Sequence, residues 1–132
     1  MTIRYSTTVI TDRLTQLNTD IGINAILRIY SGAQPASVAT AATGTLLVSL
    51  PCSATAFGAI ATGVLTANAI TTTAAAGSGT AGWFRVFKAD GVTAVVDGAV
   101  STTASDLNLN STSITATQNV SITSFAITGA PV

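Results

Sequence analysis

The chain has 132 residues, 48% of them hydrophobic and 8% charged, and its five basic and five acidic residues give a net charge of zero. This length predicts one domain with a core large enough to fold without disulfide bonds. The scattered and balanced charge excludes the basic surface of a nucleic-acid-binding protein, so we expect no nucleic-acid partner.

Composition also argues against an enzyme. The sequence contains no histidine and no glutamate, so general acid–base and nucleophilic catalysis lack their usual side chains. Cys52 is the only cysteine, which excludes an internal disulfide and a cysteine-based metal site and predicts a buried thiol. We therefore expect no catalytic residue, no cofactor and no metal ligand.

Apolar residues are frequent, but glycine, proline and threonine interrupt them before any run reaches the length of a membrane span. The first residues also lack the apolar run of a secretory signal. We expect no membrane partner. The charge-free tract between Arg28 and Arg85 is interpreted as strands whose outer faces are covered by a partner.

One amphipathic helix is predicted over residues 7–21, with Ser6 or Thr7 as its cap and Gly22 at its end. The helix can cover an open end of a β-sandwich or dock onto a neighbouring subunit, since both use the same geometry. We divide the chain into an N-terminal arm and helix, residues 1–22, and a single antiparallel β-domain, residues 23–132. The apolar positions of the helix share one face: Ile10, Leu14, Leu17 and Ile21. The first three of these are candidate interface residues.

Short strands are predicted next, at 24–30, 44–50, 54–59 and 63–70. Residues 31–42 are expected to form a loop, because Gly32 and Pro35 break regular structure. Residues 71–80 are rich in Thr, Ala, Gly and Ser and are interpreted as a flexible surface loop.

Residues 82–98 predict a β-hairpin around which the core should form. Large side chains alternate along its first arm, and Asp90-Gly91 supplies the turn because glycine tolerates positive φ. Residues 93–96 return as the second arm, which Asp97-Gly98 should close. The candidate core residues of the first arm are Trp83, Phe84, Val86 and Phe87.

The charged residues of the hairpin have two interpretations. Asp90 and Asp97 lie near Arg85 and Lys88, so cross-strand ion pairs are expected. Alternatively, Arg85, Lys88 and Asp90 contact another subunit, where charged pairs set register and partner choice.

Further strands are predicted at 107–114 and 119–128. Seven or eight short strands without crossover helices predict a mainly β fold, an antiparallel sandwich or barrel with one short N-terminal helix. Asp106, Asn108 and Asn110 have the spacing of calcium ligands, but the glycine and glutamate of a calcium loop are missing. We interpret them as a strand with a polar outer face.

Four stretches resemble a family of small virion proteins from tailed bacteriophages. These stretches are Ile26 to Gly32, Gly82 to Val86, Val96 to Gly98 and Asp106 to Asn110. The order of elements is also similar, with an N-terminal helix, a strand, a proline-containing loop, an Ala/Thr-rich middle, a tryptophan hairpin and a final strand.

The resemblance implies a structural protein of the virion. It assigns no catalytic residue to this chain. We expect a capsid decoration or cement protein that binds the outside of the major capsid protein shell and stabilises it, as a homo-oligomer for which a trimer is one option. The alternative is a tail or fibre-associated virion protein, or a module that binds host glycans. Low charge and a Thr/Ala surface favour the decoration protein, because assembly in many copies can bury apolar patches.

Overall fold

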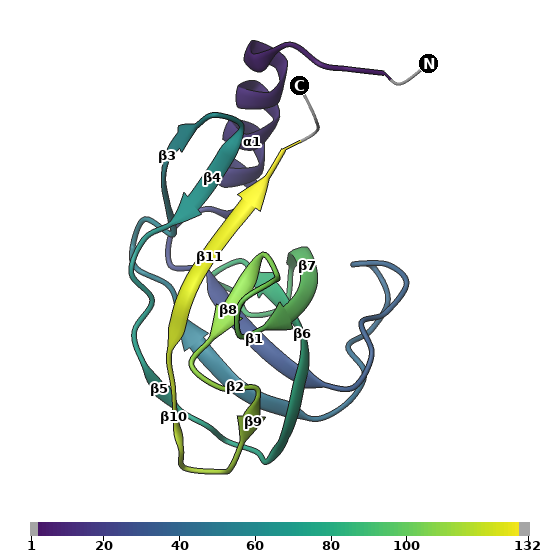
Figure 1. Cartoon of the computed structure of the whole chain (residues 1–132), viewed down its shortest axis with the longest axis vertical. Coiled ribbons are helices and arrows are strands. Elements are labelled where there is room, and N and C mark those ends of the chain that lie inside the picture. The colour runs from purple at the N-terminus through teal and green to yellow at the C-terminus, as the bar shows by residue number, and fades with distance from the viewer. Residues whose placement is uncertain (1–2, 130–132) are drawn as a thin grey trace.

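The computed structural model describes residues 3–129, which adopt a mainly β fold, as the sequence predicts (Figure 1). These residues form one N-terminal helix, a nine-stranded sheet that curls into a half-barrel, and a separate two-stranded sheet. The helix is α1 (Thr7–Ile21), and the strands are β1 (Ile26–Ser31), β2 (Leu46–Pro51), β3 (Phe57–Ala61), β4 (Val64–Ala67), β5 (Thr73–Ala74), β6 (Gly79–Phe87), β7 (Ala94–Ser101), β8 (Leu107–Leu109), β9 (Ser113–Ile114), β10 (Asn119–Val120) and β11 (Ile122–Thr128).

The large sheet has the strand order β2-β1-β6-β7-β8-β11-β4-β3, with β9 paired to β6, and β5 pairs with β10. All of these pairs are antiparallel except β7 with β8. The parallel pair departs from the all-antiparallel expectation and joins only Val100 to Leu107 and Ser101 to Asn108. The Ser101 hydroxyl accepts hydrogen bonds from the backbone N–H groups of Thr103 and Ala104, which shapes the short return loop.

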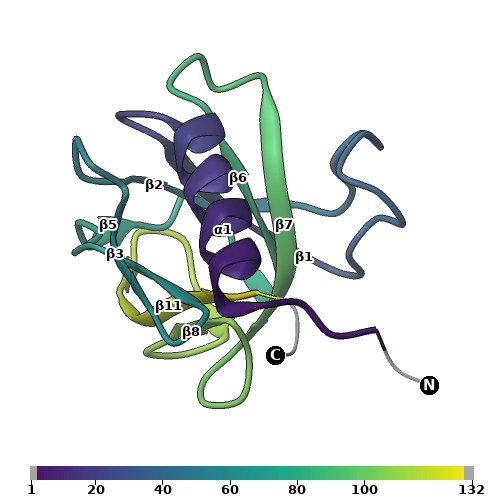
Figure 2. The same ribbon diagram turned by 90° about the horizontal axis from the view of Figure 1, so that it is seen from above.

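Helix α1 has the bounds that its sequence predicts, and it covers one end of the curled sheet (Figure 2). Ser6 caps its start by accepting a hydrogen bond from the Val9 N–H at 3.2 Å, and Gly22 ends it with φ of 75°. Ile10 and Leu14 are buried in the same hydrophobic cluster as the strands. The helix therefore closes an open end of the sheet, the first of the two roles that its pattern allows.

The packing of Ile10 explains how closely the helix is held. A Cβ atom on Gly129, beyond the end of β11, would lie 2.4 Å from the Ile10 Cγ2 atom. A Cβ atom on Gly63, in the turn between β3 and β4, would lie 3.4 Å from the same atom. Ile10 thus packs against the backbone where the β3–β4 turn meets the end of β11, since the Gly129 N–H donates to the Gly63 carbonyl at 2.8 Å. Ile10 and Leu14, expected as interface residues, are buried against the sheet of this chain.

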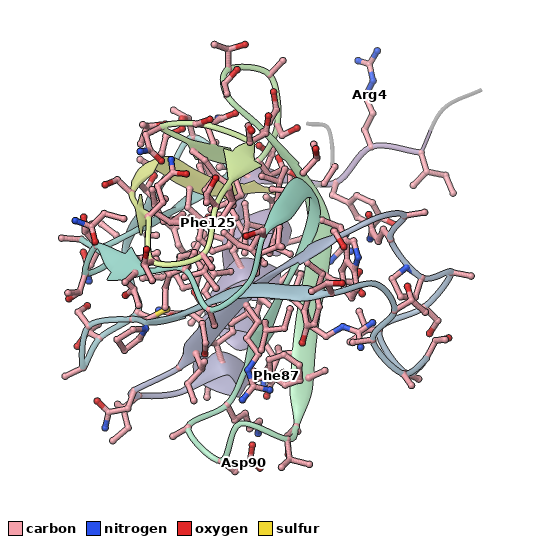
Figure 3. All side chains as sticks on the ribbon, turned by 90° about the horizontal axis from the view of Figure 1, so that it is seen from below. Arg4, Phe87, Asp90 and Phe125 are labelled. Carbon is pink, nitrogen blue, oxygen red and sulfur yellow. The ribbon has the colours of Figure 1, made fainter. Side chains whose placement is uncertain are left out.

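The main core lies on the concave face of the sheet. Alternation along β1 and β6 sends Leu27, Ile29, Phe84 and Val86 to this face, where all four belong to the hydrophobic cluster. Phe125 of β11, labelled in Figure 3, makes edge-to-face contacts with two further rings. These are Phe57, at a centroid distance of 5.3 Å, and Phe84, at 5.1 Å.

Trp83 and Phe87 do not join this core, although both are buried. They point to the opposite face of β6, because neighbouring residues of a strand face opposite sides of the sheet. All four candidate core residues of the hairpin are therefore buried, but on two different faces. Phe84 and Val86 belong to the core, whereas Trp83 and Phe87 form part of a second buried layer outside the sheet.

The second arm of the hairpin is also longer than expected. Strand β7 continues through Asp97 and Gly98, which pair with Arg85 and Phe84 of β6. A Cβ atom at Gly98 would lie 2.8 Å from a Phe84 ring carbon, so glycine here accommodates an aromatic ring and does not end the strand.

Residues 71–80 are not the free surface loop that their composition predicts. Thr73–Ala74 form β5, and the N–H groups of Ala76 and Gly77 donate to the Leu47 carbonyl at 2.8 and 3.1 Å. A Cβ atom on Gly77 would lie 2.8 Å from the Leu46 carbonyl oxygen. The small residues of this segment allow it to lie against β2. Among residues 3–129, no helix is long and apolar enough to cross a bilayer.

Substitution at Leu14 tests whether the helix belongs to the fold. We expect Leu14→Ala to lower the free energy of unfolding by about 2–5 kcal/mol, because it removes a buried side chain. Val9→Ala on the exposed side of α1 is the matched control and should change stability by at most about 0.5 kcal/mol. Urea unfolding followed by circular dichroism measures both. Equal stability of Leu14→Ala and the parent would contradict this role for the helix.

Candidate interaction surface

The β1–β2 loop, residues 32–45, is the longest connection between consecutive strands in residues 3–129. It extends away from the sheet on one side of the molecule, in blue at the right of Figures 1 and 2. The loop contains no charged and no aromatic residue, and most of its residues are exposed. Long loops without secondary structure are uncommon in small domains and usually serve a function, so the contacts that hold this one are informative.

A buried ion pair lies beneath the loop. Arg85 of β6 and Asp97 of β7 are directly paired across the hairpin, with Nη2 and Oδ2 3.0 Å apart and side chains only 4% and 6% exposed. Arg85 also donates from Nη1 to the Thr40 carbonyl at 2.8 Å and from Nη2 to the Ser37 carbonyl at 3.3 Å. Asp97 accepts a further hydrogen bond from Gln34 Nε2 at 2.7 Å. The pair therefore joins the hairpin to three residues of the loop.

Aromatic rings and guanidinium groups form the layer under this loop. The rings of Tyr30 and Trp83 stack at 4.5 Å with an angle of 14°, and Arg85 lies over the Trp83 ring at 5.0 Å. Arg28, directly across from Arg85 on β1, lies over the Phe87 ring at 4.7 Å. We call these five residues the outer layer. Guanidinium groups on aromatic faces combine apolar contact with electrostatic attraction, so the layer can be buried despite its charge.

Glycines allow the loop to meet the sheet closely at its base. A Cβ atom on Gly82 of β6 would lie 2.0 Å from the Gly32 carbonyl oxygen. Gly44, at the other end of the loop, has φ of 80°, and a Cβ atom there would lie 2.0 Å from the Ser31 carbonyl oxygen. Both positions require glycine, because backbone atoms cannot move aside as a flexible side chain can.

The tip of the β6–β7 hairpin is a second exposed feature, at the opposite end of β6, where Figure 3 shows Asp90 beyond Phe87. Asp90 Oδ1 accepts hydrogen bonds from the N–H groups of Val92 and Thr93, and Oδ2 accepts one from the Thr93 hydroxyl. These bonds, the hydroxyl's first, lower the pKa of Asp90 to about 2. Arg28 Nη1 donates to the Gly91 carbonyl at 3.0 Å, which fixes the turn to the outer layer.

The charged residues of the hairpin thus have different roles. Arg85, expected as a possible contact to another subunit, is 3% exposed and pairs with Asp97, so the cross-strand interpretation describes it. Lys88 and Asp90 are exposed at the tip, and the Asp90 carboxylate is used by the turn. Arg85 with Asp97 is the only ion pair within residues 3–129. Val92, 79% exposed, is the most exposed large apolar side chain at this tip.

A shallow groove runs beside α1, with a volume of about 410 Å³. Leu17, the third candidate interface residue of the helix, is partly buried and lines this groove together with Arg13 and Ile127. Ile10 and Leu14 also line this groove, but they are almost fully buried, whereas Leu17 is only partly buried.

Residues 3–129 contain no cluster of three side chains suited to a metal ion. Asn108 is buried rather than on a polar outer face, and its side-chain N–H groups donate to the Ser105 carbonyl at 2.8 Å and the Ser124 hydroxyl at 2.9 Å. Asn110 accepts from the Ser121 N–H. Cys52 is half-buried, and burial raises the pKa of its thiol to about 11, which makes it a weak nucleophile at neutral pH.

Sequence reasoning did not single out the β1–β2 loop as a candidate surface. The pairing of Arg85 with Asp97 could be read from the sequence, because both residues are six positions from Gly91 in the turn. The contacts of Arg85 with Ser37 and Thr40 had no such signal, because they join positions 48 and 45 residues apart. Comparison with models of protein families, with curated proteins and with solved structures finds no match for this chain.

Substitution of Trp83 tests the outer layer. Trp83→Ala should lower the free energy of unfolding by about 3–5 kcal/mol, because it removes a fully buried ring together with its contacts to Tyr30 and Arg85. Tyr5→Ala, on an aromatic residue that is 40% exposed, is the control and should have little effect. Thermal unfolding followed by circular dichroism distinguishes them. An unchanged melting temperature for Trp83→Ala would show that the layer does not stabilise the fold.

The turn at Asp90 gives a pH-dependent prediction. Its pKa is lower in the folded protein than the ordinary value of 3.8, so its contribution to stability is present above about pH 4 and is lost as the pH falls towards 2. Asp90→Asn should therefore be less stable than the parent at pH 7, and the difference should shrink between about pH 4 and pH 2. Urea unfolding across this range measures it, with Asp106→Asn as the control. A difference that stays constant down to pH 2 would refute the assignment.

Proposed function

We propose that this protein is a non-enzymatic virion component that decorates the capsid of a tailed bacteriophage and stabilises its shell of major capsid protein, acting as a homo-oligomer on the capsid surface. The proposal rests on the resemblance of its sequence stretches to small phage virion proteins, together with the surface described above.

The observation that carries the proposal is the scarcity of charge on the surface. The chain has ten charged residues, five basic and five acidic. Three of them, Arg28, Arg85 and Asp97, are not exposed. A free soluble domain normally relies on many exposed charges to avoid association. A protein that functions within a large assembly does not need many exposed charges, because neighbouring subunits cover its surface.

The glycan-binding alternative has less support. Glycan-binding modules usually stack sugars on exposed aromatic rings, but Tyr5 is the only exposed aromatic residue in the part of the chain described. The remaining aromatic side chains are all buried: Tyr30, Phe57, Trp83, Phe84, Phe87 and Phe125. A platform for host glycans in this part of the chain would therefore have Tyr5 as its only exposed aromatic ring.

Co-sedimentation tests the proposal. Recombinant full-length protein should pellet with expanded phage heads that were assembled without it, and saturate at a fixed number of copies per head. It should not pellet with unexpanded heads or with host cells. Binding to cells but not to heads would overturn the proposal and favour an adsorption module.

A further inference from the structure

Two Asp-Gly dipeptides lie in the β6–β7 hairpin, Asp90-Gly91 at its tip and Asp97-Gly98 within β7. Aspartate followed by glycine is prone to spontaneous isomerisation, because no side chain shields the glycine nitrogen. The other three aspartates precede larger residues, Arg13, Ile21 and Leu107, and no asparagine of the chain precedes glycine. The two dipeptides of the hairpin are therefore the positions at which this chemistry is expected first.

The reaction needs no catalytic residue. The backbone nitrogen of the glycine attacks the aspartate Cγ atom, and water leaves, made from the carboxyl OH and the amide hydrogen. A solvent water molecule then opens the resulting succinimide ring. Opening at the backbone carbonyl gives isoaspartate, in which the chain runs through the side chain, whereas opening at Cγ restores aspartate. No atom is oxidised or reduced in either step.

Burial protects the dipeptide within β7. The Asp97 side chain is 6% exposed, its Oδ2 atom lies 3.0 Å from Arg85 Nη2, and its Oδ1 atom accepts from Gln34 Nε2 at 2.7 Å. Asp97 and Gly98 are also paired with β6 along the strand. Ring closure there would break the buried ion pair and the strand geometry together.

The dipeptide at the tip lies in a different environment. Figure 3 shows Asp90 at the end of the hairpin, where it is exposed and solvent water reaches it. Gly91 follows with φ of 69°, a conformation that glycine adopts without strain. Neither burial nor a regular strand prevents ring closure at this position.

Hydrogen bonds within the turn hold the two reacting groups apart. Asp90 Oδ1 accepts from the N–H groups of Val92 at 2.8 Å and Thr93 at 2.9 Å, and Oδ2 accepts from the Thr93 hydroxyl at 2.6 Å. The Gly91 N–H donates to the Lys88 carbonyl at 2.9 Å. The carboxylate must therefore leave its donors, and the Gly91 nitrogen its acceptor, before the new bond can form.

The same hydrogen bonds act on the reactive form of the carboxyl group. They lower the pKa of Asp90 to about 2, with the Thr93 hydroxyl contributing most. The neutral carboxyl, which is the form that loses water, is consequently scarcer at pH 7 than in an ordinary aspartate. Among the three donors, the Thr93 hydroxyl is the one that a side-chain substitution can remove without changing the backbone.

We infer that Asp90 is a modification site of this protein, where the chain converts to isoaspartate through a succinimide with Gly91, and that the Thr93 hydroxyl sets the rate. The conversion adds one carbon atom to the backbone of the tip and moves the free carboxylate from its place beside Val92 and Thr93. It also displaces the Gly91 carbonyl, to which Arg28 donates at 3.0 Å, so the tip loses its contact with the outer layer. This inference is independent of the proposed place in a virion.

The first experiment measures isoaspartate at each position in full-length protein kept at neutral pH and physiological temperature. Electron-transfer fragmentation of its peptides assigns the position. Asp90 should convert at least tenfold faster than Asp97 in the folded protein, whereas both should convert at similar rates in concentrated urea, because only the fold distinguishes them. Equal rates in the folded protein would overturn the inference. So would an unconverted Asp90 in folded protein after the urea sample has converted.

The second experiment tests the hydroxyl. Thr93→Val keeps the shape and the N–H group but removes the hydroxyl, so isoaspartate at Asp90 should form at least threefold faster. Thr93→Ser keeps a hydroxyl and should convert as the parent does. Thr103→Val, at an exposed threonine between β7 and β8, is the matched control and should leave the rate unchanged.

The rate at Asp97 serves as an internal measure of folding in these variants. It should stay at the parent's value in Thr93→Val, since unfolding would expose both dipeptides. An unchanged rate at Asp90 in Thr93→Val would refute the role of the hydroxyl. Equal acceleration in Thr93→Ser, or an equal rise at Asp97, would refute it as well.

Discussion

The burial of the Arg85 guanidinium is the constraint on which the outer half of this structure depends. Burying a charge is costly unless hydrogen-bond acceptors and an opposite charge lie close by. Here the opposite charge comes from Asp97 on β7, and two acceptors come from the loop between β1 and β2. The register of the hairpin and the path of the loop must therefore be compatible with each other, although the loop and the hairpin are separated by the whole middle of the chain.

A second consequence is that the central strands β1 and β6 are buried on both faces. The concave face packs on Phe125 of β11, while the outer face carries the stacked rings and guanidinium groups. Each face has its own cover, provided by β11 on one side and by the β1–β2 loop on the other. This arrangement lets a short chain with few aromatic residues bury almost all of them, and it leaves a surface dominated by Thr, Ser and Ala.

Such a surface is consistent with the proposed place in a virion. Binding between uncharged surfaces depends on shape, on apolar contact and on backbone hydrogen bonds, because long-range electrostatic attraction is weak. Affinity then depends on how little order must be imposed on binding, and also on how many copies act together.

The sequence by itself determined the local features. The bounds of α1 follow from its apolar period and its Ser6 and Gly22 caps, and the Asp90-Gly91 turn places Arg85 opposite Asp97. These signals act within a few residues of each other. The strand alternation also predicted two faces for the hairpin, but not what covers each, so the separate outer layer that buries Trp83 was not foreseen. Only the tertiary structure decided that the loop closes over Arg85 and that residues 71–80 lie against β2, because those contacts join distant segments through backbone carbonyls that no side-chain pattern encodes.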